Sequence, residues 1–210
     1  MKMTESLFPA LKARPRSGAE PFHVAGVPAG FDVMAFWRWA ASDLVGNALR
    51  GVLAEFLVAR AIGAVGEVRT EWDACDLQTA ANVRVEVKSA AYVQSWSQRA
   101  LSAISFDIAP KRGWDAATGT IAASASRYAD VYVFALLAHQ DKGTIDPLDL
   151  TQWSFYVTSA AALNVAFSLQ KRIALTSLLR VAPEAVPYEA LSAAVAVAAT
   201  AIAAVPAPSV

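Results

Sequence analysis

The sequence predicts an α/β fold with a mixed central β-sheet flanked by helices. Three observations predict this class. Residues 82–89, NVRVEVKS, alternate between polar and apolar in the manner of a half-buried strand. Residues 130–139, DVYVFALLAH, form the most hydrophobic strand candidate and are expected to be buried on both faces. Residues 44–62 place apolar side chains at helical spacing and are followed by Gly63, a natural helix stop.

The elements are expected to follow one another in a simple order. Residues 1–30 carry scattered proline, glycine and charge and are expected to be an extended or poorly ordered lead-in. Residues 31–210 are expected to be a single domain with C-terminal helices. Asp32 is a candidate N-cap for a short helix rich in aromatic residues, and Ser42 or Asp43 can cap the longer helix that follows.

Strands are expected to dominate the middle of the chain. The expected strands cover residues 67–72, 83–89, 100–109, 130–139 and 153–158, with residues 73–77 leading into a further strand and a turn at 79–82. Residues 114–126 are small and polar and are expected to form a loop or a weak helix. Beyond the last strand, an amphipathic helix is expected over 164–179, and an alanine-rich helix over 188–204 is expected to cover the sheet.

The composition narrows the classes of function. Apolar residues make up 56% of the 210 residues, which excludes disorder over most of the chain. Lysine plus arginine and aspartate plus glutamate number 18 each, so non-specific coating of nucleic acid or anionic membrane is not expected. A local basic channel is still compatible with this balance, because net charge does not report how charge is distributed.

Three features bear on the cellular location. The single cysteine, Cys75, excludes an internal disulfide and a multi-cysteine zinc site, which suits a reducing compartment. The N-terminus lacks the continuous apolar run of a secretory signal. The longest apolar stretch, residues 193–205, falls short of the roughly 20 residues needed to span a bilayer. We therefore expect a soluble, cytoplasmic protein with no membrane partner.

Three acids and a lysine mark a candidate site. Glu86 and Lys88 project from the same face of the predicted strand, because side chains in a strand alternate with a period of two. Asp76 lies about one hairpin upstream, so its carboxylate can meet that of Glu86. Glu55 adds an acid within the long helix, beside apolar side chains, where an unpaired carboxylate is costly. This pattern predicts a divalent-metal site with a cationic helper.

Phosphodiester hydrolysis explains why these residue types would be assembled. The reaction needs an activated water and stabilisation of charge on the phosphoryl oxygens. Mg²⁺ held by one or two carboxylates supplies both, and a lysine beside the metal can position or deprotonate the water. Simpler interpretations exist, since Glu-x-Lys is common as a cross-strand charge pair, and Glu55 can pair with Arg50 or Arg60 or keep its head group in water.

The combined pattern resembles the PD-(D/E)XK nuclease superfamily, which has the fold of restriction endonucleases and Holliday junction resolvases. Within it, the chain is more similar to a group of uncharacterised, restriction-endonuclease-like bacterial proteins. The blocks that carry the resemblance are FWRWAASDLVGNALRGVLAEFLVARAIG, EWDACDL, VEVKSAAYVQSWSQ and ADVYVFAL, within residues 36–157. The resemblance implies a restriction-endonuclease-like core sheet flanked by helices. Cys75 stands where the motif often has a proline.

The resemblance also implies a role for each site residue. Asp76 and Glu86 would bind Mg²⁺ or Mn²⁺, Lys88 would be the catalytic lysine, and Glu55 would complete the site through water. The implied activity is that of a metal-dependent endonuclease that hydrolyses DNA phosphodiester bonds. Nucleases of this fold often dimerise to cut both strands, so a homodimer is compatible with the sequence.

Several alternatives stay open. Asp73 replaces Asp76 as the metal ligand if the strand register differs. Gln94 and Gln98 follow the predicted strand and are expected to bind substrate by orienting a water, a phosphate or the lysine. A different class of function is a catalytically inactive nuclease-fold module that binds nucleic acid or a protein partner, which the neutral net charge favours. A third is a structural domain in which the acids and the lysine form a surface ion-pair network.

Overall fold

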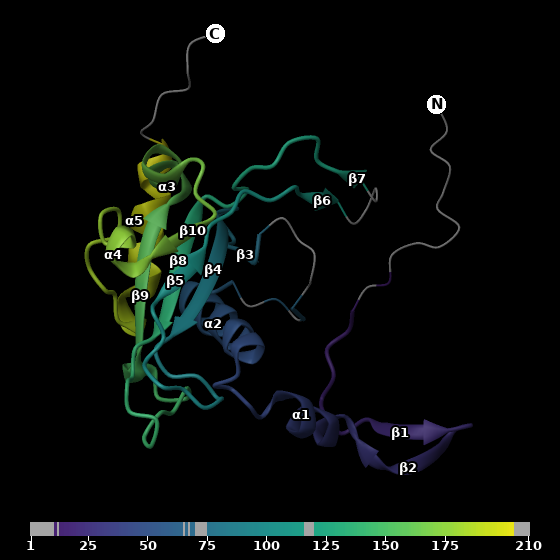
Figure 1. The fold of residues 1–210 in the computed structure, drawn as a ribbon. Coiled ribbons are helices and arrows are strands. Elements are labelled where there is room, and N and C mark those ends of the chain that lie inside the picture. The colour runs from purple at the N-terminus through teal and green to yellow at the C-terminus, as the bar shows by residue number, and fades with distance from the viewer. Residues whose placement is uncertain are drawn as a thin grey trace, which may run out of the picture.

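A four-stranded mixed β-sheet forms the centre of the molecule (Figure 1). The computed structural model describes residues 11, 13–64, 66, 68–69, 75–115 and 120–203. In spatial order the strands are β3 (Leu77–Gln78), β4 (Arg84–Ala91), β8 (Val131–Leu137) and β9 (Trp153–Ser159). β4 and β8 run parallel, and the other two pairs are antiparallel. The predicted α/β class with a mixed central sheet flanked by helices is confirmed.

β8 is an inner strand of this sheet, and all seven of its residues are buried, as its hydrophobic sequence predicts. Its alternate side chains enter two separate cores. On one face, Val131 and Val133 pack in a cluster with α2 (Asn47–Ile62) and α5 (Leu191–Ala203). A short 3-10 helix, η2 (Tyr188–Ala190), leads into α5, so the predicted C-terminal helix does cover the sheet.

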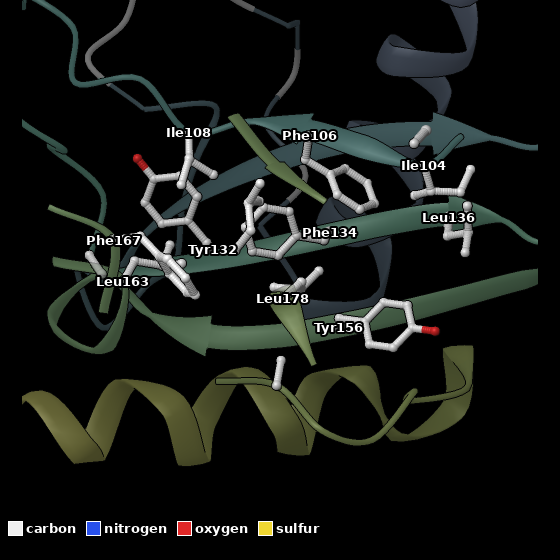
Figure 2. Packing of buried hydrophobic residues seen from close by; sticks show 14 of the residues in the cluster. Ile104, Phe106, Ile108, Tyr132, Phe134, Leu136, Tyr156, Leu163, Phe167 and Leu178 are labelled. Carbon is white, nitrogen blue, oxygen red and sulfur yellow. The ribbon is translucent and has the colours of Figure 1, made fainter. Parts of the chain in front are cut away.

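The opposite face of the sheet carries an aromatic core (Figure 2). Phe134 of β8 meets Phe106 edge-on, with 5.0 Å between the ring centroids. Phe106 belongs to β5 (Ser105–Asp107), which pairs antiparallel with β10 (Arg172–Ala174). Part of α3 (Ala160–Phe167) closes the same core. The chain between β4 and β8 thus supplies a strand, rather than a helix, to cover this face.

The N-terminal elements lie to one side of the sheet (Figure 1). β1 (Pro21–Val24) and β2 (Val27–Asp32) form an antiparallel hairpin, so the described part of the predicted lead-in contains regular structure. α1 (Val33–Ala41) follows, and Asp32 caps it as predicted, because its Oδ1 accepts the backbone N–H of Ala35 at 2.8 Å. None of the residues of α1 is buried.

α2 begins three residues later than the apolar pattern predicts. Asp43 Oδ1 accepts the backbone N–H of Gly46 at 2.9 Å, which holds the preceding residues in a turn. The helix therefore starts at Asn47 and not at residue 44. Its end agrees with the prediction, since Gly63 adopts a left-handed conformation with φ of 68° and its N–H bonds to the carbonyl of Ala59.

The helix predicted over residues 164–179 is wrong. α3 ends at Phe167, and the chain then forms β10 and a single turn, α4 (Leu175–Leu178). Arg127 explains the break, because its Nη2 donates to the carbonyl oxygens of Phe167 at 2.9 Å and Gln170 at 3.1 Å. Those carbonyls are thus taken by a distant side chain, and the following residues pair with β5.

Two further segments differ from the sequence prediction. The strand expected over 100–109 is reduced to the three residues of β5. The loop or weak helix expected over 114–126 contains β6 (Trp114–Asp115) and β7 (Thr120–Ile121), which pair antiparallel. A 3-10 turn, η1 (Leu150–Gln152), precedes β9. The short strands β5, β6 and β7 form because each has a pairing partner, and the local sequence does not predict that partner.

Some predictions from the sequence are not tested by the described part of the structure. Most of the strand predicted over 67–72, and Asp73 as an alternative ligand, lie outside the described residues. The division into a lead-in and one domain stays a prediction. Among the residues that the structure describes, no helix is long and apolar enough to cross a membrane.

Candidate active site

β4 carries the acid–lysine pair of the candidate site. Glu86 and Lys88 lie opposite Tyr132 and Phe134 of β8, on the face of the sheet that holds the aromatic core. Only 6% of the surface of Glu86 is exposed, and a carboxylate at such depth requires hydrogen-bonded partners. Lys88 supplies one, because its Nζ lies 2.5 Å from Glu86 Oε1. The two side chains therefore meet on one face of the strand, as the alternating pattern predicts.

Asp76 lies just before β3, beside β4. Because β3 is only two residues long, the backbone N–H of Val87 lies beyond the ladder, and Asp76 Oδ2 accepts its hydrogen bond at 2.7 Å. Burial, and next the charge of Glu86, raise the pKa of Asp76 from 3.8 to about 6, against the lowering effects of the Val87 bond and of Lys88. Asp76 and the acid–lysine pair thus share one electrostatic environment.

Glu55 approaches Asp76 from α2, which packs on the other face of the sheet. Its carboxylate is held by Arg69, whose Nε lies 2.5 Å from Oε2 and whose Nη2 donates to Oε1 at 3.2 Å. Glu55 and Asp76 line the same cavity of about 580 Å³, whereas Glu86 and Lys88 are not part of its wall. The charge of Glu55 also raises the pKa of Asp76, as the smallest of the contributions.

A second lysine joins the site from outside the predicted set. Lys111 Nζ donates to Glu86 Oε1 at 3.1 Å. Burial lowers the pKa of Lys111, but the charge and hydrogen bond of Glu86, together with Lys88 and the charge of Asp76, outweigh it, so the pKa is raised and the ammonium stays charged. A backbone bridge to Ser126 holds Lys111 in place. No local sequence motif predicts this contact, because Lys111 follows Glu86 by 25 residues.

The donor set fits a divalent cation of the Mg²⁺ type at Asp76 and Glu86. Mg²⁺ is commonly held by one or two carboxylates and keeps several waters, so a pair of acids is sufficient. Positive charge there would relieve the repulsion that helps to raise the pKa of Asp76. Across the described ranges, no group of three or more His, Cys, Asp or Glu side chains is close enough to hold a metal. The structure therefore does not group Glu55 with Asp76 and Glu86 as a three-acid cluster among the described residues.

The two glutamines expected to bind substrate are bonded within the protein. The Nε2 of Gln94 donates to the carbonyl of Ala91 at 2.9 Å, and its Oε1 accepts from Arg50 at 3.2 Å. Gln98 Oε1 accepts the backbone N–H of Gln94 at 2.7 Å, and its Nε2 donates to the carbonyl of Tyr92 at 3.1 Å. Both side chains fasten the turn after β4, and their contact with substrate stays a prediction.

Acids and a lysine gathered at one region of a sheet are compatible with metal-assisted hydrolysis. A comparison with known families identifies the class of protein. The model of the bacteriophage T4 endonuclease IV family matches residues 37–166, more than half of the chain. The chain therefore belongs to the bacteriophage T4 endonuclease IV family. This membership identifies a nuclease, with nucleic acid as the class of substrate. No curated protein matches the sequence.

Proposed function

We propose that the protein is a metal-dependent endonuclease of the PD-(D/E)XK type that hydrolyses DNA phosphodiester bonds. The observation that carries this proposal is the shared environment of Asp76, Glu86 and Lys88, in which one acid is half-buried with a raised pKa and the other is buried and bonded to the lysine. These are the positions that the superfamily motif assigns to two acids and a lysine. Membership of an endonuclease family supports the same class of reaction.

Each residue of the proposed site has a chemical role. Asp76 and Glu86 would hold Mg²⁺ or Mn²⁺, which when bound supplies positive charge to the phosphoryl oxygens and lowers the pKa of a water. Lys88 donates hydrogen bonds to the attacking water or to a phosphoryl oxygen, while Glu86 fixes its position. Lys111 adds a second ammonium, on a side chain that is 59% exposed, which can approach the same phosphate from solvent.

Glu55 acts from a greater distance in this scheme. It shares a cavity with Asp76 and is fixed by two hydrogen bonds from Arg69. A carboxylate in that position can orient waters around a cation without touching it. The proposal therefore gives Glu55 a positioning role. A homodimer and a cytoplasmic location accompany the proposal as predictions from the sequence.

The activity is tested by incubating the purified protein with duplex DNA, single-stranded DNA and RNA, each with Mg²⁺ and with EDTA. We expect cleavage of DNA in Mg²⁺ and none in EDTA. Asp76→Asn should lose the activity, because the amide keeps an acceptor for the Val87 N–H but binds a cation poorly.

The matched control for this test is Asp141→Asn, an exposed acid that bonds to the N–H of its own turn. It should cleave like the wild type. Cleavage of RNA alone would move the substrate class away from DNA. Failure to cleave any of the three substrates in Mg²⁺ or Mn²⁺ would favour a nuclease-fold module that binds without catalysis, and equal activity of wild type and Asp76→Asn would reject the proposed site.

A further inference from the structure

A second cavity, of about 500 Å³, has Lys88 in its wall, whereas Asp76 lines the first cavity. It lies between the start of α2, the middle of β4, and the paired strands β5 and β10. Its wall contains three cations, Lys88, Lys171 and Arg172, and one carboxylate, Asp107. Asp107 is partly occupied by its own loop, because its Oδ1 accepts the backbone N–H of Ala109 at 2.8 Å. The wall is therefore predominantly cationic.

A buried arginine lies directly behind this wall. Arg50 is 2% exposed, and its guanidinium donates to Asn47 Oδ1 at 2.6 Å and to Ser89 Oγ at 3.3 Å. Asn47 and Ser89 both line the cavity. Among the described residues, the other acceptors of Arg50 are the carbonyl of Val45 and the amide oxygen of Gln94, which are also uncharged. Arg50 is thus a buried cation whose described partners include no carboxylate.

A buried charge without a counter-ion is unfavourable, and burial accordingly lowers the pKa of Arg50. An anion in the cavity would lie on the far side of Asn47 and Ser89 from Arg50. Its negative charge would offset the cost of burying the Arg50 guanidinium. Lys171 is also available, since its ammonium makes no hydrogen bond or ion pair with any described residue. Arg172 uses Nη2 to bind Ser105 Oγ at 2.9 Å, which orients the guanidinium at the rim.

We propose that this cavity binds the phosphate group of the nucleotide next to the one that is cleaved. The inference rests on the proposed function, because Lys88 borders the cavity and bonds to Glu86 at the same time. Lys171 and Arg172 line the cavity that Lys88 borders, so a strand whose scissile phosphate lies at Lys88 can present a neighbouring phosphate to them. Contacts of this kind position the nucleic-acid backbone and carry no sequence information.

The proposal is tested by the salt dependence of binding. A short fluorescein-labelled DNA oligonucleotide is titrated with protein in EDTA, where no hydrolysis is expected, over a series of salt concentrations. Lys171→Gln and Arg172→Gln should each weaken binding. The double variant removes both cations from the one phosphate, so it should weaken binding further and reduce the slope of log Kobs against log salt by about 0.7–0.9. Both side chains are exposed, and thermal melting checks that each variant is folded.

The matched control is Arg16→Gln, which removes an exposed arginine that does not line the cavity. Its salt slope should equal that of the wild type. A double variant with wild-type affinity and slope would overturn the proposal. This readout does not require catalysis, so the subsite and the cleavage chemistry fail or succeed separately.

Inorganic phosphate separates a backbone subsite from a site for a free anion. In ¹⁵N NMR titrations, phosphate should cause saturable shifts of the Ser89, Ser105 and Arg172 amides, absent in the double variant. If phosphate saturates these amides while oligonucleotide binding is unaffected in the double variant, the cavity holds a free anion and the strand assignment is wrong. If phosphate causes no shifts at these amides, the cavity is not a phosphate site.

Discussion

Asp76 is held in an environment that opposes its ionisation. It is half-buried near Glu86, and the effects that favour its charged form are the hydrogen bond from the Val87 N–H and the charge of Lys88. In a protein that functions without a cation, such a residue would be a source of instability. In the proposed nuclease it is a ligand whose unfavourable charge is relieved when Mg²⁺ binds.

Asp76→Asn should stabilise the protein at neutral pH in the absence of metal. The pKa of Asp76 is about 6 in the folded protein, against an ordinary value of 3.8, so ionisation disfavours the folded state. The destabilisation is absent below pH 3.8, grows as the pH rises between these two values, and is complete above about pH 6. The difference of about two pKa units corresponds to roughly 2–3 kcal/mol in the free energy of unfolding.

Chemical denaturation of both proteins in EDTA, from acid to neutral pH, measures this difference. The two unfolding free energies should coincide near pH 4 and separate by pH 7, with the variant the more stable. Adding Mg²⁺ should stabilise the wild type alone and narrow the gap. A variant that is less stable than the wild type at pH 7, in EDTA, would show that the Asp76 charge is already compensated by the protein.

Sequence reasoning at the level of single residues succeeded where a short-range rule applied. Strand alternation placed Glu86 and Lys88 on one face, and the hairpin spacing brought Asp76 close to them. It failed for Lys111 and Arg50, whose positions depend on packing between segments far apart in the chain. No pattern in their neighbourhood distinguishes them from ordinary surface cations.

At the scale of elements, β5 and β10 show where local periodicity misleads. The apolar residues after α3 fit a helix, yet the chain forms a strand because β5 offers a ladder and Arg127 takes the carbonyls at the end of α3. β10 also carries Arg172 into the second cavity. The element that the sequence misassigned therefore builds a wall of the proposed phosphate subsite.

Ile173→Ala should cost about 2–4 kcal/mol in the free energy of unfolding, because the side chain is 1% exposed and part of the aromatic core. The comparison is Trp39→Ala in α1, a larger truncation at a residue that is 84% exposed, which should change stability by less than about 0.5 kcal/mol. Urea denaturation measures both. A Trp39→Ala variant destabilised as strongly as Ile173→Ala would show that α1 packs against the protein or a second copy in solution.

At the scale of the whole molecule, the proposed functional groups border two different cavities, and one strand of the sheet, β4, carries the acid that interacts with both sets. Glu55 and Asp76 border one cavity, Lys88 borders the other, and Glu86 links them through its bond to Lys88 and its charge on Asp76. The net charge of zero argued against indiscriminate binding of nucleic acid, and it did not reveal that cations gather at the second cavity. The fold class could be inferred from sequence, whereas this distribution of charge required the tertiary structure.

The most direct test of the account is the rate of Mg²⁺-dependent cleavage by Lys88→Ala under single-turnover conditions. Lys111 remains bonded to Glu86 in this variant, so the buried acid keeps a cationic partner and the fold should persist. Lys142→Ala is the control, because within the described part of the chain the Lys142 side chain donates to the backbone carbonyl of Trp96 and to no other group. We predict that Lys88→Ala cleaves at least about 100-fold more slowly than the wild type while Lys142→Ala does not. A folded Lys88→Ala variant that cleaves at the wild-type rate would contradict the account.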